Sequence, residues 1–186
     1  MLLGIILAGG QSRRMGKDKA MLDWQGDTLL AHAQQLLIEA GCDSVVVSRN
    51  APHYIRDVFA GMGPLAGIHA CLTAYPCDEA IVIPVDMPLL SSTSLINLIH
   101  QGQQLNNSCF YASSVLPCYL RVTPSLIDEC RQRLEQQRLS LQSLLRGICA
   151  AEIDFDGMSE MQELMNTNTP EQWAEANNLV NERELA

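Results

Sequence analysis

Short apolar runs that alternate with helix-like patterns are the feature that most restricts how this chain can fold. Some of these runs are suited to buried strands, since they are short, apolar and end in small or acidic residues. They cover Leu2–Leu7, Ser44–Ser48 and Ala80–Val85. Helix-like segments separate them, over Asp27–Gly41 and Pro64–Tyr75. Strands that alternate with helices predict a largely parallel sheet between layers of helices.

The second half of the chain continues this pattern less regularly. Helices are expected from Ser91 or Ser92 to about His100, and over Pro124–Arg138, Leu141–Arg146 and Pro170–Asn178. Strands are expected over Cys109–Ser114, Cys118–Val122 and Ala150–Phe155. The whole pattern predicts a doubly wound, Rossmann-like α/β sandwich of three layers with a mostly parallel sheet.

The length and composition of the chain fit a single domain. With 186 residues, of which 47% are hydrophobic, the chain can bury a sizeable core. It contains no internal repeat and no linker-like stretch. We therefore predict one domain over residues 1–178, followed by a loosely held tail over residues 179–186.

Charge and cysteine usage exclude several classes of protein. The formal net charge of −9 argues against nonspecific binding to nucleic acid or to an anionic membrane. No apolar run approaches the roughly 20 residues that span a bilayer, and Leu2–Leu7 lacks the flanks of a signal peptide. The seven cysteines are scattered and never spaced Cys-x-x-Cys, which favours reduced, mostly buried thiols over disulfides or a zinc site. We expect a cytoplasmic protein.

A glycine-rich, basic segment follows the first expected strand. Four of the twelve Lys and Arg residues fall between Arg13 and Lys19, directly after Gly9 and Gly10. An acidic protein that concentrates cations in this way is suited to bind a small anion there, although a solvated basic turn is the alternative. The segment lacks the Gly-Lys-Ser/Thr of a Walker loop and the Gly-x-Gly-x-x-Gly of a dinucleotide fingerprint. The glycines of Gly61–Gly67 more simply form a loop before a helix.

This segment has the chemistry that a polyphosphate requires. Glycines let main-chain N–H groups approach phosphate oxygens closely. Arg14 and Lys19 can neutralise charge on a polyphosphate, including the charge that grows as pyrophosphate leaves. Ser12 can donate a hydrogen bond to a phosphate or cap a helix, and Arg13 can act like Arg14 or face solvent.

Asp86 is the second candidate for chemistry. It ends an apolar strand, where a lone carboxylate is costly to desolvate unless it is paired or binds a metal. Mg²⁺ usually takes one or two protein carboxylates, while phosphates and waters complete its octahedron. The alternative is a helix or turn cap. Because loops after parallel strands meet at one edge of the sheet, Asp86 and the glycine-rich segment are expected to lie together.

Four motifs occur in order along the chain. They are Leu7-Ala8-Gly9-Gly10-x-Ser12-x-Arg14-Met15-Gly16 followed by Asp18-Lys19, then Gly63–Gly67, Val85–Pro88 and Asn166–Pro170. Together they resemble the motifs of the molybdenum cofactor guanylyltransferases, a MobA-like nucleotidyltransferase family. The first motif is shared with wider relatives, whereas the four in this order are specific.

The resemblance implies a nucleotidyltransferase fold with GTP and Mg²⁺ as ligands and molybdopterin as acceptor. Residues implied to contact the nucleotide are Leu7, Ala8, Gly9, Gly10, Ser12, Lys19, Ser48, Asp57 and Asp86. Asp86 would also bind Mg²⁺, and Arg14, Lys19 and Asp86 would carry catalysis. Asn166 and Asn168 would contact the acceptor, although asparagines before Thr-Pro also build turns and cap helices.

The chain departs from the family pattern at two places. Ser48 stands where the family usually has asparagine, with Asn50 two residues further on, so the contacts to the base are open on that side. Leu116-Pro117 replaces the His-Pro or Gln-Pro of many relatives, within a short segment from Asn106 to Leu120 that bears on the acceptor side.

The predicted reaction is transfer of GMP from GTP to the terminal phosphate of molybdopterin, with release of pyrophosphate and formation of molybdopterin guanine dinucleotide. Three alternatives stay open: a CTP-dependent molybdopterin transferase, a sugar- or isoprenoid-phosphate nucleotidyltransferase, and an inactive nucleotide-binding relative. Gly9-Gly10 favours the guanylyl branch, since cytidylyl relatives tend to have Ala-Ala-Gly. The resemblance leaves open transient contact with molybdoenzymes or their chaperones, and either a monomer or a weak oligomer.

Overall fold

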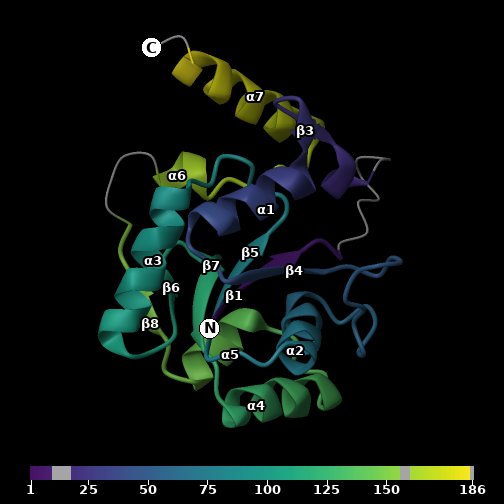
Figure 1. The fold of residues 1–186 in the computed structure, drawn as a ribbon, viewed down its shortest axis with the longest axis vertical. Coiled ribbons are helices and arrows are strands. Elements are labelled where there is room, and N and C mark those ends of the chain that lie inside the picture. Colours follow the sequence, from purple (N-terminus) through teal and green to yellow (C-terminus); the bar gives the residue numbers. More distant parts are fainter. Residues whose placement is uncertain (10–17, 156–159, 185–186) are drawn as a thin grey trace.

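A mostly parallel sheet forms the centre of the molecule (Figure 1). The computed structural model describes residues 1–9, 18–155 and 160–184. Within them, six strands pair in the order β4-β1-β5-β7-β6-β8. β7 runs antiparallel to its neighbours β5 and β6, and the other pairings of this sheet are parallel. The predicted doubly wound α/β fold is confirmed.

The elements alternate along the chain as their apolar patterns predict. The strands are β1 (Leu2–Leu7), β2 (Asp23–Trp24), β3 (Asp27–Thr28), β4 (Ser44–Ser48), β5 (Glu79–Pro84), β6 (Cys109–Tyr111), β7 (Ser114–Arg121) and β8 (Ala151–Ile153). The helices are η1 (Lys19–Met21), α1 (Leu29–Glu39), α2 (Pro64–Ala74), α3 (Ser92–Leu105), α4 (Pro124–Glu135), α5 (Leu141–Gly147), α6 (Glu160–Glu163) and α7 (Pro170–Glu184).

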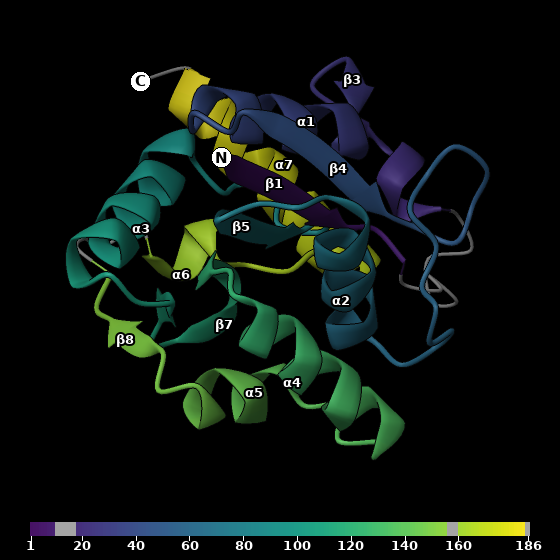
Figure 2. The ribbon, with the colours of Figure 1, turned by 60° about the horizontal axis from the view of Figure 1, so that its bottom comes forward.

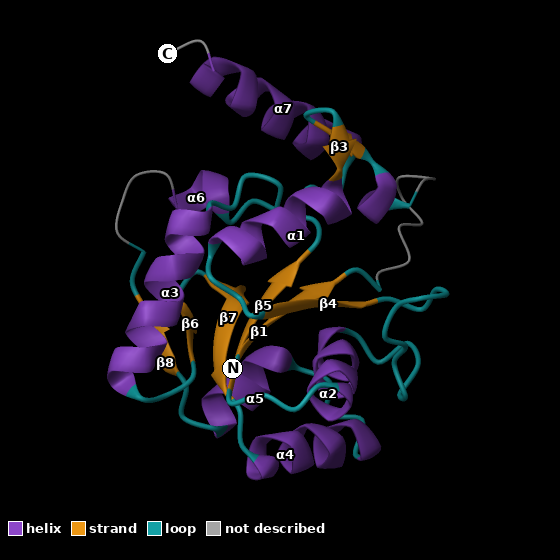
Figure 3. Ribbon diagram, in the orientation of Figure 1, coloured by secondary structure: helices purple, strands orange, loops and turns teal. Residues whose placement is uncertain are grey.

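Helices cover both faces of the sheet (Figures 2 and 3), and the sheet separates the apolar core into two clusters. α1, α3 and α7 contribute to the apolar cluster on one face, and α2, α4 and α5 to the cluster on the other. Alternate residues of β1 feed each side, because successive side chains of a strand point to opposite faces. Leu2 and Ile6 join the first cluster, whereas Leu3 and Ile5 join the second.

The order of the strands predicts where a ligand site lies. From β1 the chain crosses to β4 on one side and then returns to β5 on the other side of β1. At such a switch point the connections leave the carboxyl ends of neighbouring strands in opposite directions, which opens a crevice there. The crevice lies at the ends of β4, β1 and β5, where the glycine-rich segment and Asp86 begin.

The β7 region differs from the expected pair of short strands. β7 begins at Ser114 and runs through Pro117 to Arg121, rather than beginning at Cys118. Proline lacks the N–H that a regular ladder uses, and it is tolerated at bulges. Pro117 lies where the β6–β7 register shifts, between the pairs Phe110–Cys118 and Tyr111–Ser114. The ladder therefore continues past the proline.

The last helix, α7, is longer than the sequence predicted. α7 continues past Asn178 to Glu184. Leu179 and Val180 pack against the apolar cluster that also contains Ala176. Predicting the helix end at Asn178 was wrong because these two apolar residues extend its buried face.

A small hairpin, β2–β3, was not predicted from the sequence. Its two central residues, Gln25 and Gly26, have φ values of 53° and 85°. Positive φ at both positions is the requirement of the tight type I′ turn, and glycine meets it without strain. Thr28 ends the hairpin and caps α1 by accepting a hydrogen bond from the N–H of Ala31 at 3.1 Å. The helix therefore begins at Leu29.

The cysteines are unpaired, and most of their thiols are inert. All seven are free, and Cys71, Cys109, Cys118 and Cys130 are buried. Burial raises the pKa of Cys71 and of Cys130 to about 12. A thiol that stays protonated is a poor nucleophile. No helix in the described part of the chain combines the length and apolarity needed to cross a membrane.

Candidate functional site

The carboxyl ends of three strands meet at the crevice. Leu7, at the end of β1, pairs with Ser48 of β4 on one side and with Pro84 of β5 on the other. The pairing continues beyond the strands: the N–H of Ala8 donates to the Ser48 carbonyl at 2.9 Å, and the N–H of Val85 donates to the Leu7 carbonyl at 3.1 Å. The sheet therefore places Ser48 and Asp86 on the two sides of the β1 end.

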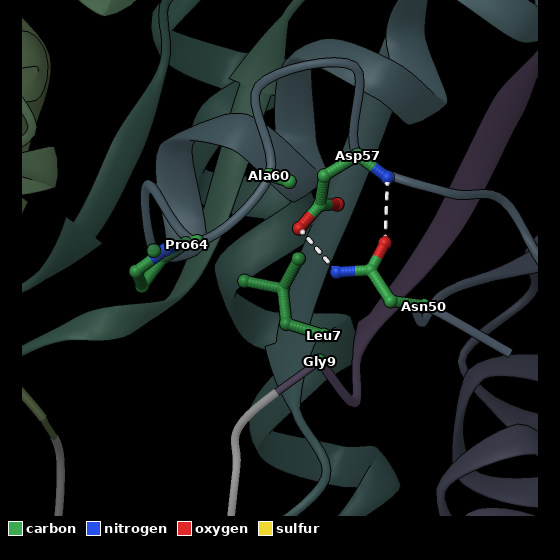
Figure 4. Close-up of a pocket in the computed structure, with 8 residues that line it drawn as sticks. Leu7, Gly9, Asn50, Asp57, Ala60 and Pro64 are labelled. Atoms are coloured by element: carbon green, nitrogen blue, oxygen red, sulfur yellow. Dashed lines mark hydrogen bonds between the residues drawn. The ribbon is translucent and has the colours of Figure 1, made fainter.

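A cavity of about 700 Å³ opens beside the end of β1 (Figure 4). Its walls come from the end of β1, from the loop after β4 and from the start of α2. The lining residues are Leu7, Gly9, Asn50, Asp57, Ala60, Gly61, Gly63 and Pro64. Figure 4 shows Asn50 and Asp57 facing each other above Leu7 and Gly9. The cavity thus combines a glycine backbone, a helix start and a carboxylate.

The carboxylate of Asp57 is held by the end of β4. Ser48 Oγ donates to Asp57 Oδ1 at 3.0 Å, and Asn50 Nδ2 lies 3.4 Å from Asp57 Oδ2. The backbone N–H of Asp57 donates back to Asn50 Oδ1 at 3.1 Å. Gly9 lies beside the same carboxylate, since a Cβ built on it would be 3.9 Å from Asp57 Oδ2. The first motif and Asp57 therefore belong to one wall.

The start of α2 packs tightly against this wall. Gly63 has a φ of 74° and precedes Pro64, the first residue of the helix. A Cβ at Gly67 would lie 2.4 Å from Ser48 Oγ and 2.9 Å from Leu7 Cδ2. Glycine is therefore required at position 67 for α2 to reach the strand ends. The contact brings the N-terminus of the helix, the positive end of its dipole, to the cavity that Gly63 and Pro64 line.

A second group of predicted residues gathers at the end of β5. Lys19 Nζ donates to Asn168 Oδ1 at 2.6 Å and lies 3.5 Å from Asp86 Oδ2. The side chains of Lys19 and Asp86 are 12% and 22% exposed, so both are partly desolvated while remaining open to solvent on one side. One ammonium therefore contacts the candidate metal ligand and a candidate acceptor residue.

The Asn166–Pro170 segment is fixed to the Asp86 turn through its backbone. Thr167 donates to the Asp86 carbonyl from its N–H at 2.9 Å and from Oγ1 at 3.2 Å. The N–H groups of Asn168 and Thr169 both donate to Gln172 Oε1, at 2.8 and 3.1 Å. α7 is itself anchored, since Trp173 packs edge-on against Trp24 of β2, with ring centroids 5.4 Å apart. Asn168 is thus held in place by the fold.

Two further residues, His32 and Arg49, support the site from outside. His32 on α1 lies 3.1 Å from the Pro88 carbonyl through Nε2, which must donate because a carbonyl only accepts. Burial lowers the pKa of His32, opposed in part by this hydrogen bond. Arg49 forms an ion pair with Asp18, next to Lys19, and its guanidinium lies 5.3 Å from the ring centroid of Tyr54. Both ends of the site are therefore tied to neighbouring elements.

The donor set at Asp86 fits a hard divalent cation that arrives with phosphate oxygens. Asp86 offers one partly exposed carboxylate at the crevice. In the described part of the chain, no group of three or more His, Cys, Asp and Glu side chains gathers as a metal site. A cation held there needs most of its ligands from a bound nucleotide and water, which is how Mg²⁺ is commonly bound.

The structure brings most of the predicted residues together in two neighbouring groups. Leu7, Ala8, Gly9, Ser48 and Asp57 form or adjoin the cavity wall, and Lys19, Asp86 and Asn168 meet at the end of β5. Asn166 is half-buried in the segment between them and α7. Gly10, Ser12 and Arg14 lie outside the described residues.

Two contributors were missed in assigning roles from the sequence. Asn50 was noted only as an asparagine near a departure from the family pattern, yet it binds Asp57 at two points. Thr167 lies within the last motif but was given no role, yet its two hydrogen bonds hold that motif to the backbone of Asp86. The only signal in the sequence was the proximity of each residue to a recognised one.

Comparison with known proteins finds relatives along most of the chain. Residues 4–153 match the model of the MobA-like NTP transferase domain. The molybdenum cofactor guanylyltransferase of Xanthomonas euvesicatoria is 38% identical over 176 residues, covering 92% of each chain.

Solved structures share the same fold. The molybdopterin-guanine dinucleotide biosynthesis protein A of Archaeoglobus fulgidus superposes with a TM-score of 0.79 at 21% identity, covering 98% of this chain and 100% of that one. A Mycobacterium tuberculosis protein in complex with manganese gives a TM-score of 0.63 at 16% identity, with 94% and 97% covered. The family-model match and the Xanthomonas relative together show that the chain belongs to the MobA-like NTP transferase family.

Proposed function

We propose that this protein transfers GMP from GTP to the terminal phosphate of molybdopterin and releases pyrophosphate. The observation that carries the proposal is the contact of Lys19 with both Asp86 and Asn168. These residues come from three of the four motifs, and they join the candidate phosphate, metal and acceptor positions. Relatives named molybdenum cofactor guanylyltransferase support the choice of substrates.

GTP is proposed to bind along the end of β1. Its base and ribose occupy the cavity beside Leu7, Gly9 and Asp57, with Ser48 behind the carboxylate. Its phosphates extend over the segment that includes Gly10, Ser12 and Arg14 toward Lys19, where main-chain amides and cations can neutralise them. The start of α2 adds a favourable dipole on the other side.

Molybdopterin is proposed to approach from the Asn166–Pro170 segment. An oxygen of its terminal phosphate attacks the α-phosphorus of GTP, and the bond from that phosphorus to the β-phosphate oxygen breaks. Pyrophosphate leaves with the bonding electrons, and the dinucleotide is complete without a covalent enzyme intermediate. Asn168 and Asn166 orient the acceptor, while Lys19 balances charge on the leaving group.

Asp86 is proposed to hold the divalent cation, Mg²⁺ in this proposal. A related fold has been solved with manganese, which supports a divalent ion of this kind. When bound, the cation neutralises charge on the α-phosphate and orients the phosphate chain. The protein is further proposed to act in the cytoplasm, as a monomer or weak oligomer.

The reaction is tested by incubating the purified protein with Mg²⁺, molybdopterin and each nucleoside triphosphate in turn, and identifying the dinucleotide by mass spectrometry. Molybdopterin guanine dinucleotide, formed in preference to its cytosine counterpart, is the expected product. A cytosine product, or GTP binding without any transfer, would overturn the proposed reaction.

Asp86→Ala is predicted to abolish turnover while the fold persists. Removing the carboxylate takes away the protein's ligand to the cation, which is worth several kcal/mol in the transition state. We expect pyrophosphate release to fall by at least about 100-fold. Asp128→Ala, at an exposed carboxylate on α4, is the matched control. Circular dichroism verifies folding, and near-normal pyrophosphate release by the Asp86 variant would refute the metal assignment.

A further inference from the structure

Asn50 forms two hydrogen bonds with Asp57 on the cavity wall. Its Nδ2 faces Asp57 Oδ2 at 3.4 Å, and its Oδ1 accepts from the Asp57 N–H at 3.1 Å. Reversing the amide would set two acceptors against each other at one contact and two donors at the other, so the two contacts fix its orientation. Asn50 therefore holds both the backbone and the carboxylate of Asp57.

The carboxylate is held on its other side by Ser48. The hydroxyl of Ser48, which is 2% exposed, donates to Asp57 Oδ1 at 3.0 Å. Within the described residues, each carboxylate oxygen thus has one protein donor, and an ionised carboxylate oxygen has the capacity to accept a further hydrogen bond. Because Asp57 lines the cavity together with Leu7 and Gly9, that capacity is available to a ligand in it. The carboxylate is presented with both oxygens fixed.

A fixed carboxylate discriminates among nucleobases. Guanine carries two adjacent N–H donors on one edge, N1–H and the 2-amino group, which match two carboxylate oxygens. Adenine and cytosine each place an acceptor nitrogen beside their amino group, so one oxygen of the carboxylate would face an acceptor. Repulsion of this kind rejects wrong ligands as effectively as attraction selects the right one.

We propose that Asn50 is a positioning residue for base selection, which orients Asp57 so that both carboxylate oxygens face the donor edge of guanine. This inference rests on the proposed use of GTP. It assigns to Asn50, with Ser48, the support of the base site in a chain that lacks the family's usual asparagine at position 48. Without Asn50, Asp57 Oδ2 loses its anchor and only Oδ1 stays in place.

The test compares the binding of GTP with that of ITP, which lacks only the 2-amino group. Dissociation constants are measured by calorimetry with Mg²⁺ present. The wild type is expected to prefer GTP by about tenfold, the size of one hydrogen bond to a charged group. Asn50→Ala is expected to weaken GTP binding by about tenfold and ITP binding much less, so that the preference falls toward one.

A second variant tests whether the effect of Asn50→Ala on base preference comes from misfolding. Asn50→Asp has the same shape but sets a negative charge against Asp57 Oδ2, so it is expected to lose the preference as well. Asn178→Ala, at an exposed asparagine of α7 outside the cavity lining, is the control and keeps the wild-type ratio. Thermal unfolding of each variant shows whether it is folded.

The outcomes separate this inference from the proposed reaction. If both Asn50 variants are folded and keep the wild-type ratio of GTP to ITP affinity, Asn50 does not position Asp57 for base selection. That ratio is measured by binding alone, so it is informative even if no dinucleotide forms. Failure to form molybdopterin guanine dinucleotide counts against the reaction and leaves the base preference intact.

Discussion

Lys19 is the residue at which the candidate site converges. Its ammonium contacts Asn168 at 2.6 Å and Asp86 at 3.5 Å, and it follows Asp18, which is paired with Arg49. A flexible lysine stem loses considerable rotamer entropy when it is held in one place. Asn168 reduces that cost at the moment of binding by fixing the ammonium in advance. Asn168 can therefore contribute to the reaction through Lys19 as well as through the acceptor.

A double-mutant cycle tests how Asn168 acts. Lys19→Met is expected to lower kcat/KM by about 100-fold or more, because charge neutralisation of the phosphates is lost. Asn168→Ala is expected to lower it about tenfold. If Asn168 acts through Lys19, the double variant is expected to be no slower than Lys19→Met. Steady-state rates of pyrophosphate release provide the measurement.

The opposite result has a clear meaning. Effects that multiply in the double variant would show that Asn168 contacts the acceptor independently of Lys19. In that case the defect of Asn168→Ala would lie in the KM for molybdopterin. Lys19→Arg is a useful companion, since it keeps the charge and changes only the geometry of the donors.

At the same scale, the sequence identified the chemistry of the site better than its contacts. Lys19, Asp86 and Asn168 were singled out by motif and residue type, and their roles stay predictions. The sheet topology predicted that the glycine-rich segment and Asp86 lie together, but not the contact of Lys19 with Asn168, because these two residues are 149 positions apart and only the folded sheet and α7 bring them together. The role of Asn50 was missed for the same reason. Its hydrogen bonds to Asp57 depend on the path of the loop after β4, which residue types alone do not show.

At the scale of elements, the packing of α2 on the strand ends links stability to the cavity. Gly67 has no room for a Cβ, because Ser48 Oγ and Leu7 Cδ2 already occupy that space. Gly102 on α3 is equally crowded, since a Cβ there would lie 2.1 Å from the ring of Tyr119. The two glycines therefore pose the same packing problem, but only Gly67 adjoins Ser48.

Gly67→Ala is predicted to weaken both the fold and nucleotide binding. Overpacking typically costs about 1–3 kcal/mol in the free energy of unfolding. The displaced Ser48 hydroxyl would also release Asp57, so the affinity for GTP is expected to fall about tenfold. Gly102→Ala is the matched control, with a similar loss of stability and unchanged GTP affinity. Urea unfolding and calorimetry measure the two effects, and equal GTP affinity in both variants would contradict the link.

The elements themselves were predictable where local signals are strong. β1, β4 and α2 follow from short apolar runs, from the Pro64 start signal and from small residues at their ends, and they match the structure closely. The β2–β3 hairpin was missed because strands of two residues carry too little periodicity. α7 was ended too early because its polar composition obscures the contacts of Leu179 and Val180.

At the scale of the whole molecule, the site is a property of the fold and not of one segment. Its parts come from the ends of β1, β4 and β5, from η1 and from the approach to α7. A ligand that joins these parts binds only the folded protein, because the unfolded chain has no such arrangement. Ligand binding and global stability are therefore linked.

Saturating GTP with Mg²⁺ is predicted to raise the melting temperature of the whole molecule. At a free ligand concentration of 100 times Kd, linkage contributes about 2.7 kcal/mol. For a chain of this size each kcal/mol shifts Tm by roughly 2–4 °C, so an increase of about 5–10 °C is expected. The shift is expected to shrink when EDTA removes the cation or when Asp86 is replaced by alanine. Equal shifts from GTP, ATP and CTP would contradict base selection at Asp57, and the absence of any shift with GTP would contradict nucleotide binding at this edge of the sheet.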